Sequence, residues 1–153
     1  MLADRVAQLN AAYARAIDDD RLEHWPALFT DPCLYKITSA DNYRRGLEVG
    51  LVYADSRGML EDRVAALREA NIYERQAYRH VVGLPALDAG PDGAVHAETP
   101  FLVVRVMRDG TMDLFATGRY VDLVVDDSGT LRFRERVVVC DSSRVDTLLA
   151  IPL

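Results

Sequence analysis

The sequence lacks the features that several large classes of protein need. No apolar run approaches the ~20 residues that a membrane-spanning helix requires. Met1 to Leu9 carries Asp4 and Arg5, and it has no apolar core followed by a small-residue cleavage site, as a secretory signal would have. Gly-x-Gly and Gly-Lys-Ser/Thr phosphate-binding patterns are absent, and so are Ser-His-Asp and Cys-His nucleophile motifs. We therefore expect a cytoplasmic protein without a membrane partner.

Cysteine and histidine are scarce. Cys33 and Cys140 stand far apart in the sequence, which favours two buried thiols in a reducing cytoplasm, although a single disulfide stays possible. A mononuclear iron site needs two histidines and a carboxylate. The three histidines, His24, His80 and His96, do not stand at ligand spacing from one another. We therefore predict no metal site in this chain.

Composition predicts a globular protein with an acidic surface. The 153 residues are half hydrophobic, and 18 basic against 24 acidic side chains give a net charge of −6. This size and composition predict one domain over residues 1–153. An acidic balance argues against a nucleic-acid partner, because such proteins need a cationic surface. Arg132, Arg134 and Arg136 alternate along one segment, which predicts one strand face that meets solvent or a partner.

The first half of the chain has the spacing of helices. Apolar residues at steps of three and four predict a first helix with Val6, Leu9, Tyr13 and Ile17 on its buried face. The Asp18 to Asp20 run offers N-caps for a short second helix, which Pro32 would end. A strand is predicted over residues 33–38, and a third helix is predicted with Leu60, Val64 and Leu67 inward.

The second half of the chain has the regularly spaced turn signals of a β-meander. Turn signals at residues 91–93, 109–110 and 127–129 separate strand-like segments, since Asp and Gly tolerate the positive φ of tight turns. The predicted strands are Val81–Leu87, Val95–Met107, Thr111–Val125 and Thr130–Cys140. Helices followed by a long antiparallel sheet predict an α+β layout. The layout resembles the nuclear-transport-factor-two-like (cystatin-like) cone, in which N-terminal helices pack on a curved antiparallel sheet.

Small enzymes of that cone fold, such as steroid isomerases, transfer protons with Asp, His and Tyr side chains. Residues here that could supply such a set are Asp19, Tyr35, Tyr53, His80 and Glu135. The plainer interpretation of His80 is a ring that ties its strand to a nearby carboxylate or carbonyl. Glu135 shares a predicted strand face with Leu131 and Phe133, where a carboxyl could have a raised pKa. A module that binds a small ligand without converting it is a further alternative.

Several segments resemble the small (beta) subunits of bacterial aromatic-ring-hydroxylating dioxygenases. The first is EDRVAALREANIYERQAYRHVVGL, Glu61 to Leu84, in which a helix leads through aromatic and basic residues to an Arg-His strand. Others are NAAYARAIDDD, HWPALFT and CDSSRVDTLLAIPL, which begin at Asn10, His24 and Cys140. The resemblance runs over nearly the whole chain, and it implies a structural subunit without catalytic residues of its own.

The resemblance also implies partners and cofactors in other chains. It implies a large (alpha) subunit in a hexamer of three large and three small subunits, and a separate reductase that draws on a nicotinamide cofactor. The large subunit would carry a Rieske [2Fe-2S] cluster and a mononuclear Fe(II). This chain cannot supply a Rieske centre, because that needs two cysteines and two histidines and neither Cys33 nor Cys140 has a nearby histidine. The complex would act on terephthalate, an aromatic dicarboxylate.

Two segments are candidate subunit interfaces. An apolar run near the end of the chain would be a liability on a free monomer, and the arginines described above could pair with a neighbour, since Arg is enriched at interfaces. The candidates are Leu148, Leu149, Ile151 and Leu153, with Arg132, Arg134 and Arg136.

Overall fold

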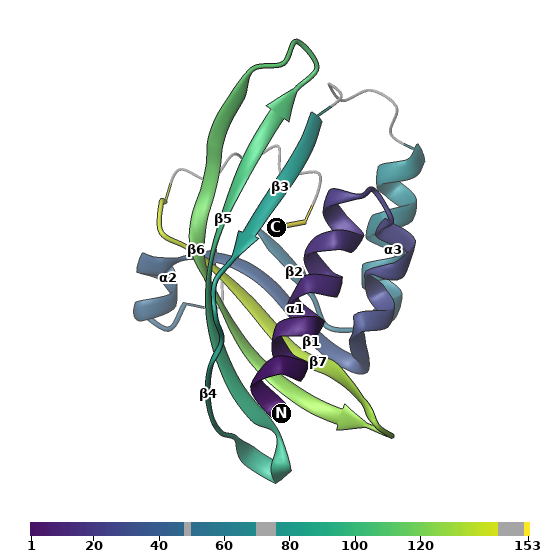
Figure 1. Cartoon of the computed structure of the whole chain (residues 1–153), viewed down its shortest axis with the longest axis vertical. Coiled ribbons are helices and arrows are strands. Elements are labelled where there is room, and N and C mark those ends of the chain that lie inside the picture. The colour runs from purple at the N-terminus through teal and green to yellow at the C-terminus, as the bar shows by residue number, and fades with distance from the viewer. Residues whose placement is uncertain (48–49, 70–75, 144–151) are drawn as a thin grey trace.

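The computed structural model describes residues 1–47, 50–69, 76–143 and 152–153. The first part of the chain is mainly helical, and a run of strands follows (Figure 1). In order, the elements are α1 (Leu2–Asp18), η1 (Leu22–His24), η2 (Pro26–Leu28), β1 (Phe29–Ser39), α2 (Ala40–Arg44), β2 (Val52–Ala54), α3 (Arg57–Glu69), β3 (Gln76–Val82), β4 (Ala86–Ala89), η3 (Pro91–Gly93), β5 (Val95–Met107), β6 (Met112–Asp127) and β7 (Thr130–Cys140).

The strands in the described ranges form one curved, seven-stranded sheet. Its order is β2-β1-β7-β6-β5-β3, with β4 also paired to β5. The pairing of β1 with β7 is parallel and all the others are antiparallel. Figure 1 shows α1 and α3 side by side against one face of this sheet, which we call the inner face. The predicted α+β layout, with helices on a curved sheet, is confirmed.

Helix α1 forms because its apolar residues fall on one stripe. Val6, Leu9, Tyr13 and Ile17 are all buried, as their spacing predicts. The inner face of the sheet meets this stripe with Tyr35, Tyr120 and Phe133, none of which has any exposed surface. The core of the protein therefore lies between α1, α3 and the inner face of the sheet.

The turns of the meander have the backbone that their residues predict. Gly93, Gly110 and Gly129 adopt φ angles of 78°, 89° and 93°, in the left-handed region that glycine enters without steric cost. The β5-β6-β7 meander is therefore confirmed. The strand predicted over Val81–Leu87 is instead two strands, β3 and β4, and both pair with β5.

The predictions for residues 18–38 need correction. The short second helix is a pair of three-residue 3-10 turns, η1 and η2, and η1 begins after Arg21 rather than after an aspartate cap. Pro32 does not end a helix, because it lies within β1, after a cis Asp31-Pro32 peptide bond. Helix α2 and strand β2 were not predicted, since both are too short to show a period.

A β-bulge in β7 changes which side chains face inward. Phe133 pairs with Val124 of β6, but Glu135, two residues further on, pairs with Leu123, only one residue away. The extra residue shifts the two-residue alternation of the strand. Phe133 points inward before the bulge, and Arg136 occupies the inner face after it, with no exposed surface. Arg136 is therefore not on a surface stripe with Arg132 and Arg134, and that prediction is wrong.

Candidate functional site in the interior of the cone

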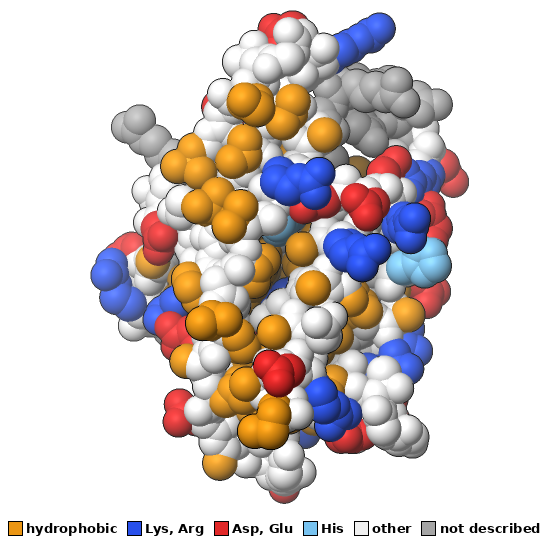
Figure 2. All heavy atoms as spheres, viewed as in Figure 1, with side chains coloured by type: hydrophobic (Ala, Val, Ile, Leu, Met, Phe, Trp, Pro, Cys, Tyr) orange, Lys and Arg blue, Asp and Glu red, His pale blue; other side chains and the backbone are white. Residues whose placement is uncertain are grey.

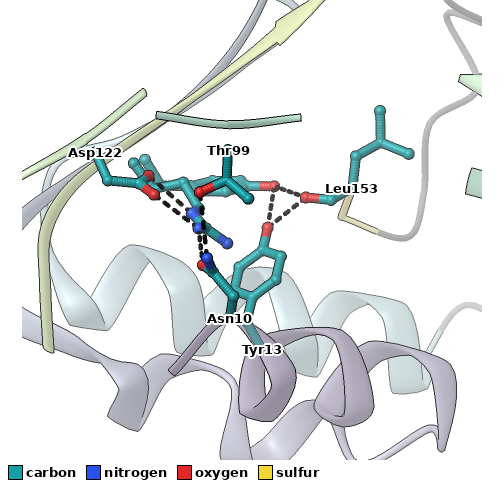
Figure 3. A network of polar contacts seen from close by, with 7 residues as sticks. Asn10, Tyr13, Thr99, Asp122 and Leu153 are labelled. Atoms are coloured by element: carbon teal, nitrogen blue, oxygen red, sulfur yellow. Dashed lines mark hydrogen bonds and ion pairs between the residues drawn. The ribbon is translucent and has the colours of Figure 1, made fainter. Parts of the chain in front are cut away.

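A buried ion pair lies at the centre of the interior. The Arg136 guanidinium donates from Nε to Asp122 Oδ1 at 2.9 Å and from Nη2 to Asp122 Oδ2 at 2.8 Å. Neither side chain has any exposed surface. Arg136 Nη2 also donates to the side-chain Oδ1 of Asn10, and Asn10 Nδ2 donates to Thr99 Oγ1 at 3.3 Å. Figure 3 shows this network joining α1 to β5 and β6.

Three aromatic rings enclose the guanidinium. Arg136 Cζ lies 3.8 Å from the ring centroid of Tyr120, 3.9 Å from that of Phe133 and 4.3 Å from that of Tyr13. The remaining nitrogen, Nη1, makes no hydrogen bond within the described residues. The ring faces thus pack against the guanidinium, and such cation–π contacts contribute about 2 kcal/mol when desolvated.

The pair is held in its charged form by its own geometry. Burial lowers the pKa of Arg136, but the charge and hydrogen bonds of Asp122 outweigh it, so that the net pKa is raised. Burial raises the pKa of the Asp122 carboxyl, and the guanidinium opposes this rise. Within the described residues, the centre of the interior thus contains a fixed, fully enclosed charge pair.

The hydroxyl groups of Tyr13 and Tyr35 meet the main chain of Leu153. These hydroxyls lie 3.2 Å apart, and both donate to the Leu153 main-chain oxygen, with a distance of 3.2 Å from Tyr35. The Leu153 side chain is fully buried (Figure 3). Leu153 therefore packs into the chain's own core, as part of the filling of the cone.

Alkaline pH should unfold the protein as its buried tyrosines ionise. Burial raises the pKa of Tyr13 to about 12, from 10.0, and raises the pKa values of Tyr35 and Tyr120 well above 10.0. Since the fold favours the neutral phenols, their contribution to stability is complete below pH 10 and is lost as the pH rises from 10 toward 12. We expect a late rise of tyrosinate absorbance that coincides with the loss of circular dichroism. Ionisation of all seven tyrosines before any loss of dichroism would contradict this.

His80 is tied to the end of α1 by Asp18. Asp18 Oδ1 lies 2.6 Å from His80 Nδ1, and Asp18 Oδ2 accepts the His80 backbone N–H at 2.8 Å. Both side chains are buried, and His80 Nε2 has no hydrogen-bond partner in the described part of the chain. An ionised carboxylate only accepts hydrogen bonds, so the ring proton lies on Nδ1. The plainer interpretation of His80, a ring that ties its strand to a carboxylate, is confirmed.

The residues proposed for proton transfer are not brought together. Asp19 is exposed at the C-terminal end of α1, whereas the side chain of Asp18 is buried against His80. Tyr53 is 54% exposed on β2. Glu135 follows the bulge and lines a shallow outer depression of about 440 Å³ with Arg134, so it does not share an apolar face with Leu131 and Phe133. His80 and Tyr35 are inside, but the structure gives them no contact with each other.

The remaining interface candidates fall in different places. Arg132 donates to Asp127 at 3.0 Å and to the Ala27 carbonyl, so it is occupied within its own chain. Arg134 is half-buried in the outer depression. Leu148, Leu149 and Ile151 lie outside the described residues, as does the linker at 73–75.

The side chains that the structure describes do not fit an iron–sulfur cluster. Cys140 pairs with Ser39, six residues along β1 from Cys33, which separates the two thiols by roughly 20 Å of strand. Both are buried free cysteines, and burial raises their pKa values to about 11 for Cys33 and about 12 for Cys140. No group of three or more His, Cys, Asp or Glu side chains that could hold a metal occurs among the described residues. Within the same ranges, no helix is long and apolar enough to span a bilayer.

Sequence reasoning missed most of the interior network. Asn10 sits at a helical step from Val6 and Tyr13, which is a detectable signal, since a polar residue on an apolar stripe needs a buried partner. Asp122 is likewise a charged residue among hydrophobic residues of β6, and such a residue also needs a buried partner. Their common partner, Arg136, could not be found without knowledge of the bulge.

Comparisons with known proteins agree with this arrangement. Residues 12–147 match the family described as "Ring hydroxylating beta subunit". The chain is 50% identical over 149 residues to subunit beta 1 of the terminal oxygenase component of terephthalate 1,2-dioxygenase from Comamonas sp, covering 97% of each chain. It is 40% identical over 148 residues to the anthranilate 1,2-dioxygenase small subunit of Burkholderia cepacia, covering 97% of this chain and 92% of the other.

A solved structure extends the likeness to three dimensions. It is described as the beta subunit of an aromatic-ring-hydroxylating dioxygenase from Novosphingobium aromaticivorans, and it superposes with a TM-score of 0.91 at 39% identity. The match covers 99% of this chain and 97% of the other. The cone, with its closed charge pair, thus occurs in a chain that matches these relatives nearly end to end. This protein belongs to the family of ring-hydroxylating dioxygenase beta subunits.

Proposed function

We propose that this chain is the small subunit of a cytoplasmic aromatic-ring dioxygenase that acts on terephthalate, and that its 153 residues work as one domain. In this proposal the large subunit carries a Rieske [2Fe-2S] cluster and a mononuclear Fe(II), in a hexamer of three large and three small subunits. A separate reductase delivers electrons from a nicotinamide cofactor. Identity of 50% to terephthalate dioxygenase beta subunits, over 97% of the chain, is the observation that carries the proposal.

The filled interior supports a structural role. An enzyme of this fold needs an open cavity in which a substrate can reach the acid and the base. Here Arg136, Asp122 and three aromatic rings occupy the centre of the cone, and Leu153 packs beside Tyr13 and Tyr35. Asp122 accepts two hydrogen bonds from Arg136, and the Leu153 main-chain oxygen accepts from Tyr13 and Tyr35. The interior therefore supplies rigidity, and rigid elements suit a subunit that must hold its neighbours in position.

The purified chain should contain no iron and should be colourless and inactive. After co-expression with its large subunit, we expect a brown complex that consumes oxygen when terephthalate, the reductase and a nicotinamide cofactor are present. Iron content, visible absorbance and oxygen uptake measure this directly. Stoichiometric iron or oxygen uptake in the isolated chain would show that the assignment of catalysis to the large subunit is wrong.

Substrate choice needs its own comparison. Anthranilate is the natural control, since the chain is also 40% identical to an anthranilate dioxygenase small subunit. The same complex, assayed with each substrate at equal concentration, should consume oxygen faster with terephthalate. Faster uptake with anthranilate would leave the structural role intact and would contradict the dicarboxylate assignment.

A further inference from the structure

The two tyrosine hydroxyls that meet Leu153 form one end of a small site with two parts. Tyr13 comes from α1 and Tyr35 from β1, and their hydroxyl oxygens lie 3.2 Å apart. Both hydroxyls donate to one acceptor, the main-chain oxygen of Leu153 (Figure 3). The Leu153 side chain fills the other end of the site. An acceptor oxygen and a compact apolar body are therefore the two features that this site binds.

The site is separate from the exposed apolar side chains of the protein. Those gather over β3, β5 and β6 (Figure 2), where Val81 is 54% exposed and Met112 is 69% exposed. Tyr13, Tyr35 and Leu153 have no exposed surface at all. A ligand that used these groups would therefore have to take the place of Leu153.

Further hydrogen-bond donors lie unused in the core beside this site. Within the part of the chain that the structure describes, the Tyr120 hydroxyl and Trp25 Nε1 are buried and make no hydrogen bond. The Trp25 ring centroid lies 5.1 Å from that of Tyr35, and the Tyr120 ring centroid lies 5.6 Å from that of Tyr13. Buried donors without an acceptor are uncommon in native proteins. Their presence here indicates a site with room for more acceptor oxygens than Leu153 supplies.

The three phenol groups lie within electrostatic reach of one another. Burial is the main cause that raises the pKa values of Tyr35 and Tyr120, and Tyr13 adds to the rise in both. The main-chain oxygen of Leu153 engages two of the three hydroxyls and leaves that of Tyr120 unpaired. A carboxylate has two oxygens with about four acceptor positions, and hydrogen bonds to an ionised acceptor are the stronger kind. A carboxylate therefore suits this donor cluster better than a single main-chain oxygen does.

We propose that the interior of the cone is a binding site for a small carboxylate with a compact apolar body, and that Leu153 occupies this site in cis. The carboxylate accepts hydrogen bonds from Tyr13 and Tyr35, and the apolar body takes the volume of the Leu153 side chain. The ligand and Leu153 exclude each other, so the affinity of the intact chain is reduced by the fraction of molecules in which Leu153 holds the site. This binding goes beyond the proposed function and needs no large subunit, because every group belongs to this chain.

Titration with 4-methylpentanoate, the carbon skeleton of leucine without its amino group, tests the competition with Leu153. The chain has one tryptophan, Trp25, which packs on Tyr35, so its fluorescence reports binding of this non-absorbing probe. Deleting Pro152 and Leu153 should lower the apparent Kd about tenfold or more relative to the intact chain, since Leu153 no longer competes. Equal affinities in the two folded proteins, or binding to neither, would overturn the proposal. If circular dichroism shows that the deletion does not fold, Leu153→Gly takes its place, and an affinity no higher than that of the intact chain overturns the proposal in the same way.

Two controls separate recognition of the carboxylate from filling of an apolar hole. In the deletion variant, Tyr35→Phe removes one donor and should weaken binding of the probe about tenfold. Tyr53→Phe, at a hydroxyl whose residue is 54% exposed, should leave the affinity unchanged. 4-Methylpentylamine has the same apolar body with an ammonium group, which cannot accept a hydrogen bond, and it should not bind. Equal binding of the amine and the carboxylate, or an unchanged affinity in Y35F, would show that the hydroxyls recognise no carboxylate and would overturn the proposal.

Discussion

Replacing Asp122 with alanine should lower the free energy of unfolding by about 3–5 kcal/mol, the cost typical of breaking a buried ion pair from one side. The Arg136 guanidinium would keep its charge inside the cone and lose two hydrogen bonds, at 2.9 and 2.8 Å. Asn10 and the aromatic rings cannot replace a carboxylate. Urea denaturation followed by circular dichroism measures the change.

Two controls separate the lost pair from the lost volume. The double replacement Asp122→Leu with Arg136→Met removes both charges and should recover most of the stability, since apolar groups of similar size can replace such pairs. Glu98→Ala breaks the exposed pair with Arg119, at 2.8 Å, and should cost less than about 1 kcal/mol. Equal losses in D122A and E98A would show that the interior pair is not a major source of stability.

Asp18→Ala should be the second most damaging substitution. It leaves two buried donors of His80, the backbone N–H and Nδ1–H, without their acceptor. Each unsatisfied buried group costs about 1–3 kcal/mol, so the expected loss in unfolding free energy is about 2–4 kcal/mol. Asp18→Asn keeps one acceptor oxygen and should lose less. Asp19→Ala is the matched control, because its exposed side chain makes no such contact, and it should be nearly neutral.

A substitution at His80, the partner of Asp18, distinguishes a structural role from a proton-transfer role. In the complex, His80→Asn should reduce oxygen uptake only in proportion to the amount of complex that assembles. Native mass spectrometry gives that amount, and the uptake per assembled hexamer should match the unmodified protein. If uptake disappeared from an intact hexamer, His80 with Asp18 would have a chemical role after all.

The regular parts of the fold were predictable because each had a period or a turn to mark it. Helix α1 showed its stripe from Val6 to Ile17, and the meander showed glycines at residues 93, 110 and 129 that take positive φ. Elements shorter than two periods, such as α2, β2 and the 3-10 turns, carried no such signal. Their positions depend on contacts with strands far away in the sequence.

The interior site was predictable only in part. His80 was identified as a residue that could bind a carboxylate or carbonyl, but its partner stayed unnamed, since the sequence does not show which member of the Asp18–Asp20 run turns inward. Arg136 was placed on the surface because strict alternation was assumed through β7. The family resemblance was more informative here than the residue patterns, since it did not depend on knowing the inward-facing side chains.

The extra residue in β7 has a practical consequence for anyone who edits this strand. Deleting Arg134 would remove the bulge and leave Arg136 two residues after Phe133, so regular alternation alone would keep both side chains on the inner face. Deleting Val137 would instead turn Val138 and Cys140, which now lie inside, to the opposite side. The number of residues in this strand, rather than the chemistry of any one side chain, thus decides which side chains of its second half face the interior.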